Sequence, residues 1–243
     1  MTADQKPQSS ELHPGPGFRI RHAIERPDPA LVQAFRGFEG PMISDLMNRL
    51  YTMRPAIQNM TDADLVPLVG PACTVKVFPG DNLMVHAALD VARPGDVLVI
   101  DAGGSHMNAV LGDLVSNKAR HRGIAGIVVD GLVRDIDGIR AARIPVFGRG
   151  ITPVGPLHRG PGEINFPIQC GGIVVRPGDL IFADNNGVVV VPLEIASELQ
   201  KRCQEKQEKE AAYVASVKLG KFSNAWVHVE LATSGCVMVD GQD

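Results

Sequence analysis

Three charged side chains have the types and the spacing to do chemistry together: Asp113, Arg134 and Asp135. Asp113 follows a glycine and opens a pattern typical of a helix. An acidic residue at a helix start accepts hydrogen bonds from backbone N–H groups and suits the positive end of the helix dipole. The N–H groups of Leu114 and Val115 would then point outward, so the sequence predicts a site for a small anion.

The elements around these residues indicate how they could meet. The helix that starts at Asp113 ends at Gly123, and residues 126–129 are a short apolar run typical of a buried strand. The charged loop 130–135 then carries the Arg-Asp pair away from the end of that strand. Open α/β sheets collect ligand groups at such strand ends, so we expect the charged groups and the two amides to converge.

The same residues resemble a family signature. An Asp, twenty intervening residues and then Arg-Asp are the signature of the RraA-like family. The family includes class II (metal-dependent) 4-hydroxy-4-methyl-2-oxoglutarate / 4-carboxy-4-hydroxy-2-oxoadipate aldolases and regulators of ribonuclease activity. The flanking stretches 79–101 (PGDNLMVHAALDVARPGDVLVID) and 166–192 (FPIQCGGIVVRPGDLIFADNNGVVVVP) resemble the family's flanking blocks. The resemblance covers roughly residues 40–215 in continuous order.

Strands that alternate with helices indicate an α/β fold. The resemblance implies the layered αββα sandwich of the swivelling (phosphohistidine-domain-like) type, with N- and C-terminal helices; the pattern alone does not separate it from a Rossmann-like sheet. We expect residues 1–18, which are polar and proline-rich, to be a flexible arm. Residues 19–243 are expected to form a single RraA-like domain that includes a C-terminal helix at about 193–218 and a tail.

The resemblance also implies roles for the three charged residues. Asp135 would hold Mg²⁺ or Mn²⁺ directly, and Asp113 would orient waters bound to the metal. Arg134 would bind the ketone oxygen of a pyruvyl group, whose carboxylate would meet the amides of Leu114 and Val115. Cleavage next to a 2-oxo acid builds an enolate, and its negative oxygen needs a cation and a guanidinium. For an arbitrary Arg-Asp dipeptide, a structural ion pair is the better interpretation.

A third acid is implied from the C-terminal helix of a neighbouring subunit. Glu205, Glu208 and Glu210 are the candidates; Glu210 fits best and would act through water. A solvated charge run is the alternative for any one of them. The resemblance therefore implies a site at a subunit interface and a homotrimer or hexamer.

Further polar residues lie outside the signature. Family aldolases have a bulkier loop where this chain has residues 103–111, so His106 and Asn108 are expected to shape a different end of the substrate. His158 and Arg159 follow in a proline- and glycine-rich crossover and are candidates for a distal carboxylate, with a plain surface role as the alternative. His86 lies on a predicted helix among apolar neighbours, and we expect it to be structural.

Two functions are compatible with these residues. The first is a divalent-metal-dependent lyase that forms a pyruvate enolate from a 2-oxo acid, by retro-aldol cleavage or by decarboxylation of oxaloacetate. The second is a non-catalytic regulator that binds a ribonuclease or another protein. The combination of Asp113, Arg134 and Asp135 favours the enzyme, because a pure binding protein has no need of it.

Composition narrows the range of partners and compartments. A net charge of −3 argues against a nucleic-acid partner, whose surface normally needs a basic footprint. No apolar run is long enough for a membrane span, and the N-terminus lacks the pattern of a signal peptide. The four cysteines lie far apart without metal-binding spacing. We expect a cytoplasmic protein with no membrane partner.

Overall fold

The computed structural model describes residues 11–239, so most of the predicted N-terminal arm lies outside the described range. The chain divides into two units, residues 1–203 and residues 204–243. The prediction of one domain over residues 19–243 stays a prediction.

The ten-residue strand β3 (Leu68–Val77) organises the large sheet of the first unit. Its second half pairs in parallel with β4, which is followed across the sheet by parallel β6 and β8. The strands of this sheet, in spatial order around β3, are β1 (Phe18–Ile20), β10 (Gly162–Ile164), β3, β4 (Val97–Asp101), β6 (Gly126–Asp130), β8 (Val146–Gly148) and β2 (Gln58–Asn59).

The first half of β3 pairs instead with a hairpin. The strands β13 (Leu180–Asp184) and β14 (Gly187–Val191) are antiparallel, and Asp184 lies opposite Gly187. The sequence Asp184-Asn-Asn-Gly187 between two apolar runs predicts a hairpin turn, and the structure confirms it, with two residues in the turn. A second, smaller hairpin joins β11 (Ile168–Cys170) to β12 (Ile173–Val175).

Alternate side chains of the central strands point into different cores. Leu98 and Ile100 of β4 pack with the helices α3 (Leu83–Val91), α4 (Asp113–His121) and α5 (Ile136–Ala141). Val97 and Val99 of the same strand pack against the two hairpins.

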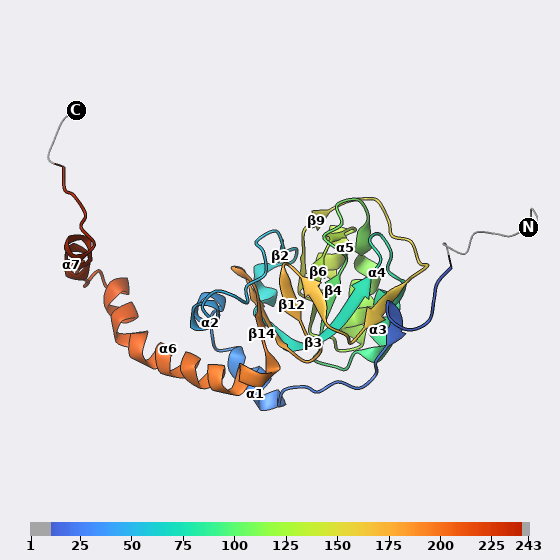
Figure 1. Cartoon of the computed structure of the whole chain (residues 1–243), viewed down its shortest axis with the longest axis horizontal. Helices are drawn as coiled ribbons and strands as arrows, with labels where there is room; N and C mark the ends of the chain where they lie inside the picture. The colour runs from blue at the N-terminus through green and yellow to red at the C-terminus, as the bar shows by residue number, and fades with distance from the viewer. Residues whose placement is uncertain (1–10, 240–243) are drawn as a thin grey trace, which may run out of the picture. The chain divides into compact units, whose positions relative to one another are not determined.

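A third core lies on the far side of the β13–β14 hairpin. It is closed by α1 (Pro29–Phe35), α2 (Gly40–Leu46) and the start of α6 (Ala196–Lys218). The helices α3, α4 and α5 thus lie on one side of the strands and α1 and α2 on the other (Figure 1). The predicted α/β class is confirmed, with its layers in the order helix, sheet, sheet, helix.

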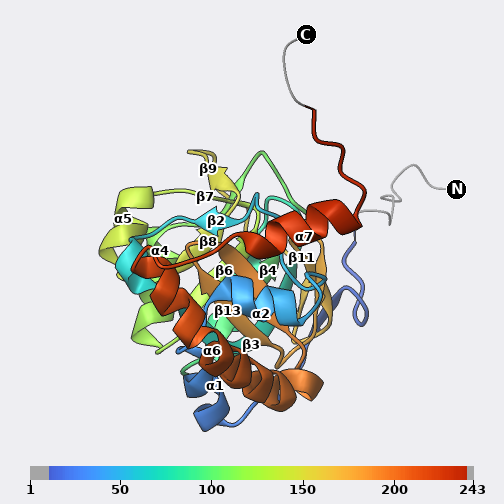
Figure 2. The same ribbon diagram turned by 90° about the vertical axis from the view of Figure 1, so that its left-hand side faces the viewer.

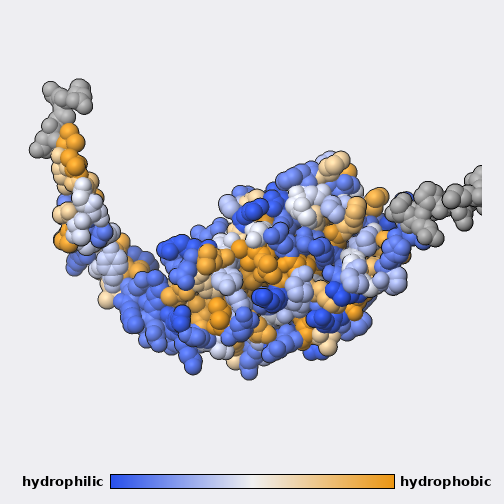
Figure 3. All heavy atoms as spheres, viewed as in Figure 1, coloured by the Kyte–Doolittle hydropathy of each residue, from blue (hydrophilic) through white to orange (hydrophobic). Residues whose placement is uncertain are grey.

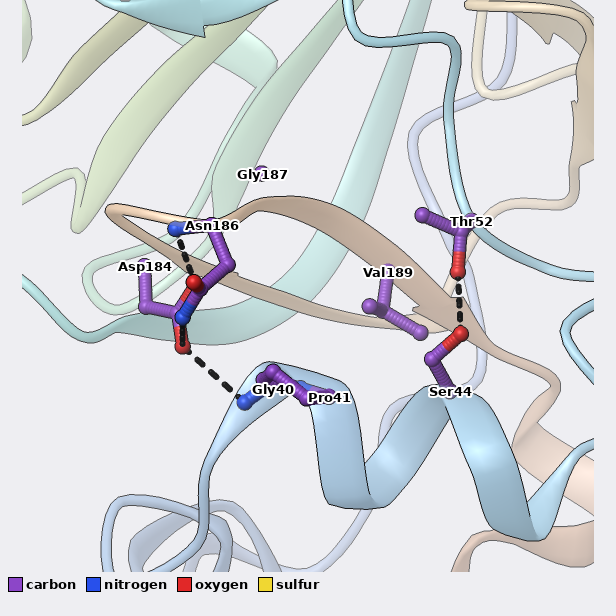
Figure 4. Close-up of a pocket in the computed structure, with 8 residues that line it drawn as sticks. All are labelled: Gly40, Pro41, Ser44, Thr52, Asp184, Asn186, Gly187 and Val189. Atoms are coloured by element: carbon purple, nitrogen blue, oxygen red, sulfur yellow. Dashed lines mark hydrogen bonds between the residues drawn. The ribbon is translucent and has the colours of Figure 1, made fainter. Parts of the chain in front are cut away.

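Helix α2 is fixed to the hairpin turn by side-chain hydrogen bonds. Gly40 N–H donates to Asp184 Oδ2 over 2.9 Å, and the Ser44 and Thr52 hydroxyls lie 2.7 Å apart (Figure 4). The Asp184 carboxylate thereby satisfies an N–H group at the helix start. Figure 2, turned by 90°, shows α2 against β13, and these elements are in contact. The shallow pocket between them has a volume of about 130 Å³.

A small parallel sheet was not predicted. Residues 103–111 and 130–135 were both expected to be loops, but Ala109–Leu111 forms β5 and Leu132–Val133 forms β7. Both pair in parallel in a three-stranded sheet with β9 (Gly150–Ile151) in the order β5-β7-β9. Strands of two and three residues carry too little periodicity to be distinguished from loops.

The second unit holds the rest of α6 and the helix α7 (Ala225–Thr233). Its part of α6 carries i,i+4 ion pairs, Lys206 with Glu210 at 3.2 Å and Lys209 with Glu205 at 3.9 Å. Apolar side chains also lie on the surface of this unit (Figure 3). The large hydrophobic residues exposed there are Tyr213, Val214, Val217, Leu219, Phe222, Trp226, Val229, Val237, Met238 and Val239.

Within residues 11–239, no helix has both the length and the hydropathy that crossing a bilayer requires. The cytoplasmic location stays a prediction.

The sequence Arg-Pro-Gly-Asp occurs twice, at 93–96 and 176–179, each time before an apolar run, which predicts two similar turn–strand units. The structure confirms them, with β4 after the first turn and β13 after the second. The Asp96 carboxylate accepts from Arg93 N–H at 2.8 Å, and Asp179 accepts from Arg176 N–H at 2.7 Å. Asp96 also binds the Arg26 guanidinium through both oxygens, at 2.8 and 2.7 Å. The carboxylate of this pair is 1% exposed and the guanidinium 15%.

We predict that Asp96→Ala lowers the free energy of unfolding by about 3–5 kcal/mol, because it leaves a largely buried guanidinium without its partner. Asp45 is the matched control: its ion pair with Arg49 is exposed, so Asp45→Ala should cost less than about 1 kcal/mol. Urea denaturation of the two variants measures the difference. Equal losses would contradict a structural role for the buried pair.

Candidate active site

The parallel pairing of β5 with β7 brings the predicted site residues together. Leu111 lies opposite Val133 in the register of the two strands. Asp113 follows two residues after the end of β5, and Arg134 and Asp135 follow β7 directly. Neighbouring parallel strands end at the same edge, so residues 21 positions apart in the chain meet there. The predicted strand end at residue 130 is not the one that positions them.

These residues line one side of a hollow of about 230 Å³. Its other walls come from the start of α3 and from the crossover after β9. The residues around it are Asn82, His86, Leu111, Gly112, Asp113, Leu114, Val115, Arg134, Asp135, Pro156 and His158.

Asp135 is held in an unusual backbone conformation. Its φ of 54° and ψ of 47° are left-handed, a region that Asp tolerates better than most residues. It is the residue before the first turn of α5, yet its side chain caps no N–H group of that helix. The carboxylate lies 3.1 Å from Arg134 Nε and is 47% exposed. An ion pair this exposed adds little to stability, which leaves both groups available to a ligand.

Two glycines without side chains leave space for the Arg134 and Asp135 side chains. A Cβ atom on Gly112 would lie 2.6 Å from Asp135 Oδ2, and one on Gly155 would lie 2.5 Å from Arg134 Nη1. Asn108 donates to the Gly155 carbonyl over 2.8 Å and so fixes the backbone beside the guanidinium. The expectation that Asn108 shapes a different end of the substrate stays a prediction; its side chain contacts the segment that packs against Arg134.

Asp113 is the first residue of α4, as predicted, and its Oδ1 accepts from Leu114 N–H at 2.7 Å. The amide of Leu114 is therefore not free, and an incoming anion would have to replace this hydrogen bond. Gly138 of α5 lets the two helices approach, because a Cβ atom there would lie 2.5 Å from Asp113 Cβ. The starts of α4 and α5 thus hold the two acids on neighbouring elements.

A polar wall formed by Asn82, His86 and His158 lies on another side of the hollow. Asn82 is 3% exposed; its Nδ2 donates to the Val110 carbonyl over 3.0 Å, and its Oδ1 lies 2.6 Å from His158 Nδ1. The His86 and His158 rings meet edge to face, 5.9 Å apart. Burial, followed by the charge of Lys118, lowers the pKa of His86.

The polar wall was only partly anticipated. The sequence predicts His158 as a candidate and His86 as structural, whereas Asn82 is not among the predicted site residues. The sequence feature that could have revealed Asn82 and His86 is the stretch 79–86, because the turn before α3 places both of these side chains at the hollow. Two other candidates do not line the hollow in the described part of the chain: His106 is exposed, and Arg159 is held through its backbone N–H by Asp81 Oδ2 at 2.6 Å.

The oxygen donors of the site suit a hard divalent cation. Asp135 offers a carboxylate that caps no helix, and Asp113 offers a second one on the adjacent helix start. Within residues 11–239, no group of three or more His, Cys, Asp and Glu side chains is placed to hold a metal ion. A cation with two nearby acids and several waters matches the way Mg²⁺ is usually bound. Glu210 belongs to the second unit and is not placed relative to this site.

Comparison with known proteins gives the family. The RraA-like family described as Aldolase/RraA matches residues 40–190. The chain belongs to the RraA-like family. A Halalkalibacterium halodurans relative named "Putative 4-hydroxy-4-methyl-2-oxoglutarate aldolase" is 42% identical over 181 residues, which are 74% of this chain and 85% of the relative. An Ectopseudomonas mendocina protein of the same name is 42% identical over 123 residues, 51% of this chain and 75% of that protein.

A solved structure points to the same RraA-like family. Streptomyces coelicolor RraAS2, described as an unusual member of the RNase ES inhibitor RraA protein family, superimposes with a TM-score of 0.69 at 30% identity. The match covers 78% of this chain and 100% of that one. The predicted resemblance is confirmed.

We predict that Gly112→Ala disturbs the site without unfolding the protein, since the new methyl group must displace the Asp135 carboxylate and the Arg134 side chain. Binding of Mn²⁺, followed by calorimetry, should weaken at least tenfold, in the range seen when groups around a metal site are moved. Gly37→Ala is the control, because a Cβ atom there meets only the Ala34 carbonyl at 3.6 Å. Unchanged Mn²⁺ affinity in Gly112→Ala would contradict this account of the site.

Proposed function

We propose that this protein is a divalent-metal-dependent lyase that forms a pyruvate enolate from a 2-oxo acid. The main support for this proposal is that the half-exposed Arg134–Asp135 ion pair and Asp113 line the same polar hollow. The aldolase names of the relatives support a lyase of this kind. The substrate class is 4-hydroxy-4-methyl-2-oxoglutarate and similar compounds, with oxaloacetate decarboxylation as a second reaction through the same enolate.

Each residue of the hollow has a separate role in the proposed formation of the enolate. Asp135 would hold Mg²⁺ or Mn²⁺ directly and Asp113 would hold it through water; such a cation would supply positive charge near the ketone oxygen of the substrate. Arg134 binds the ketone oxygen of the pyruvyl group and shares the charge that develops on it. The amides of Leu114 and Val115 at the start of α4 receive the substrate carboxylate, the former by exchanging its bond to Asp113.

We also propose that the active protein is a homotrimer or hexamer with composite sites. Glu210 of a neighbouring subunit would act on the cation through water. The exposed apolar side chains of residues 204–239 support this, because large exposed apolar surfaces mark interaction sites.

A non-catalytic regulator is the second candidate function. The observation in its favour is the overlap with RraAS2 across the full length of that protein. A regulator would keep its partner binding when Asp135 is replaced, whereas the lyase would lose turnover.

Asp135→Asn is predicted to abolish pyruvate release from 4-hydroxy-4-methyl-2-oxoglutarate and from oxaloacetate, assayed with and without Mg²⁺ or Mn²⁺, since a neutral amide binds a hard cation poorly. Asp137→Asn, two residues further along the exposed start of α5, is the matched control and should stay active. Full metal-dependent turnover by Asp135→Asn would show that another residue holds the cation. A parent protein inactive on both substrates would favour the regulator.

If each site is shared between two subunits, lyase activity should recover when two inactive variants assemble into one oligomer. Asp135→Asn and Glu210→Gln should each be impaired alone, but hetero-oligomers of the two contain some interfaces with both acids intact. Activity should therefore reappear when the two variants are co-expressed, and light scattering should show a trimer or hexamer. Glu208→Gln, on the same helix, is the control. An active monomer, or no recovery in proven hetero-oligomers, would rule out a shared site.

A further inference from the structure

The hydrogen bonds of Asn82 fix the proton position on His158. The Val110 carbonyl can only accept, so the Asn82 amide nitrogen donates to it and the amide oxygen must be the group that faces His158. An amide oxygen can only accept, so His158 Nδ1 carries the hydrogen. In the neutral ring Nε2 is then unprotonated, and it can accept a proton.

The backbone around His158 is tied down by the turn before α3. Asp81, which is 2% exposed, accepts from Arg159 N–H at 2.6 Å and from Gly160 N–H at 3.0 Å. Asn82 N–H donates to the Leu157 carbonyl over 3.0 Å. His158 therefore projects from a segment that is fixed on both sides, although its side chain is exposed at the hollow.

We infer that His158, held by Asn82, is the base that takes the proton from the C4 hydroxyl of a 4-hydroxy-2-oxo acid. This inference rests on the proposed function. Arg134 and Asp135 on one wall would bind the pyruvyl end, and His158 on another wall would face the carbon that leaves. The His86 ring, edge-on to His158, limits the rotation of that imidazole.

The retro-aldol step then balances. The hydroxyl proton goes to Nε2, and the C4–O bond becomes a carbonyl. The C3–C4 bond breaks, and its electron pair forms the C2=C3 double bond of the enolate. The enolate then takes a proton at C3 from water, and His158 releases its own proton to water, so the ring returns to its starting state.

If His158 is this base, only substrates with a C4 hydroxyl group depend on it. Oxaloacetate loses carbon dioxide from C4, and the exchange of pyruvate methyl protons with D₂O involves no C4 atom. Neither reaction removes a hydroxyl proton. Both still require the enolate, so they report on Arg134, Asp135 and the cation independently of His158.

The test compares these reactions in His158→Gln, which keeps a polar side chain but has no basic nitrogen. Retro-aldol kcat should fall about 100-fold or more relative to the hydroxyl-free reactions, the usual contribution of a general base. His22→Gln, at an exposed position away from the hollow, is the control and should leave the ratio unchanged. Added imidazole should restore part of the retro-aldol activity of His158→Ala.

The outcomes distinguish the inference from the function on which it rests. An unchanged ratio, a parallel fall in all reactions, or a selective fall without imidazole rescue overturns the base role and leaves the lyase in place. A parent protein with neither enolate reaction and no retro-aldol activity overturns both.

Discussion

The parallel pairing of β5 with β7 is the constraint on which the candidate site depends. The two strands are only three and two residues long, and the hydrogen bonds between them decide which side chains meet. Leu111 opposite Val133 puts the start of α4 next to the start of α5. A shift of one residue would turn the alternating side chains to the other face and separate the acids. Gly112 and Gly138 then allow an approach that any side chain would block.

The acids of this protein fall into two groups with opposite environments. Asp81, Asp96 and Asp179 each follow a Pro-Gly pair and are at most 2% exposed. Each accepts backbone N–H groups and so closes its own turn. Asp135, by contrast, is 47% exposed and caps no helix. A carboxylate whose hydrogen bonds are already made inside the fold has little left for a cation, so the exposed acid is the one suited to binding.

The sequence predicted the long-range outline better than the short elements. The helix from Asp113, the buried strand predicted at 126–129 and the hairpin at 184–187 all carry strong local signals: an acid after a glycine, an unbroken apolar run and two asparagines followed by a glycine. These were confirmed. The strands β5 and β7 were missed because two or three residues cannot show a period, and their burial comes from the surrounding fold.

The polar wall shows a different limit of sequence interpretation. Asn82 and His158 are 76 positions apart, and nothing local in either segment specifies their hydrogen bond. The crossover residues 152–161, between β9 and β10, have an irregular backbone, so their side-chain directions are set by contacts with the turn before α3. Asp81 makes those contacts by accepting from backbone N–H groups, which every residue except proline would supply at position 159. The residue types in the crossover therefore do not reveal, from the sequence alone, that this segment is held against the turn before α3.

The charges in the hollow explain why a cation and this arrangement belong together in the proposed reaction. Asp113 and Asp135 carry two negative charges and Arg134 one positive charge, so the cluster alone is negative by one. A 2-oxo diacid carries two negative charges and would be repelled by that sum. A divalent cation held at Asp135 would reverse the sign of the cluster. Burial lowers the pKa of His86, which favours the neutral form of that ring in the polar wall. Substrate attraction would then depend on the cation at Asp135, and one bound ion would couple substrate binding to enolate formation.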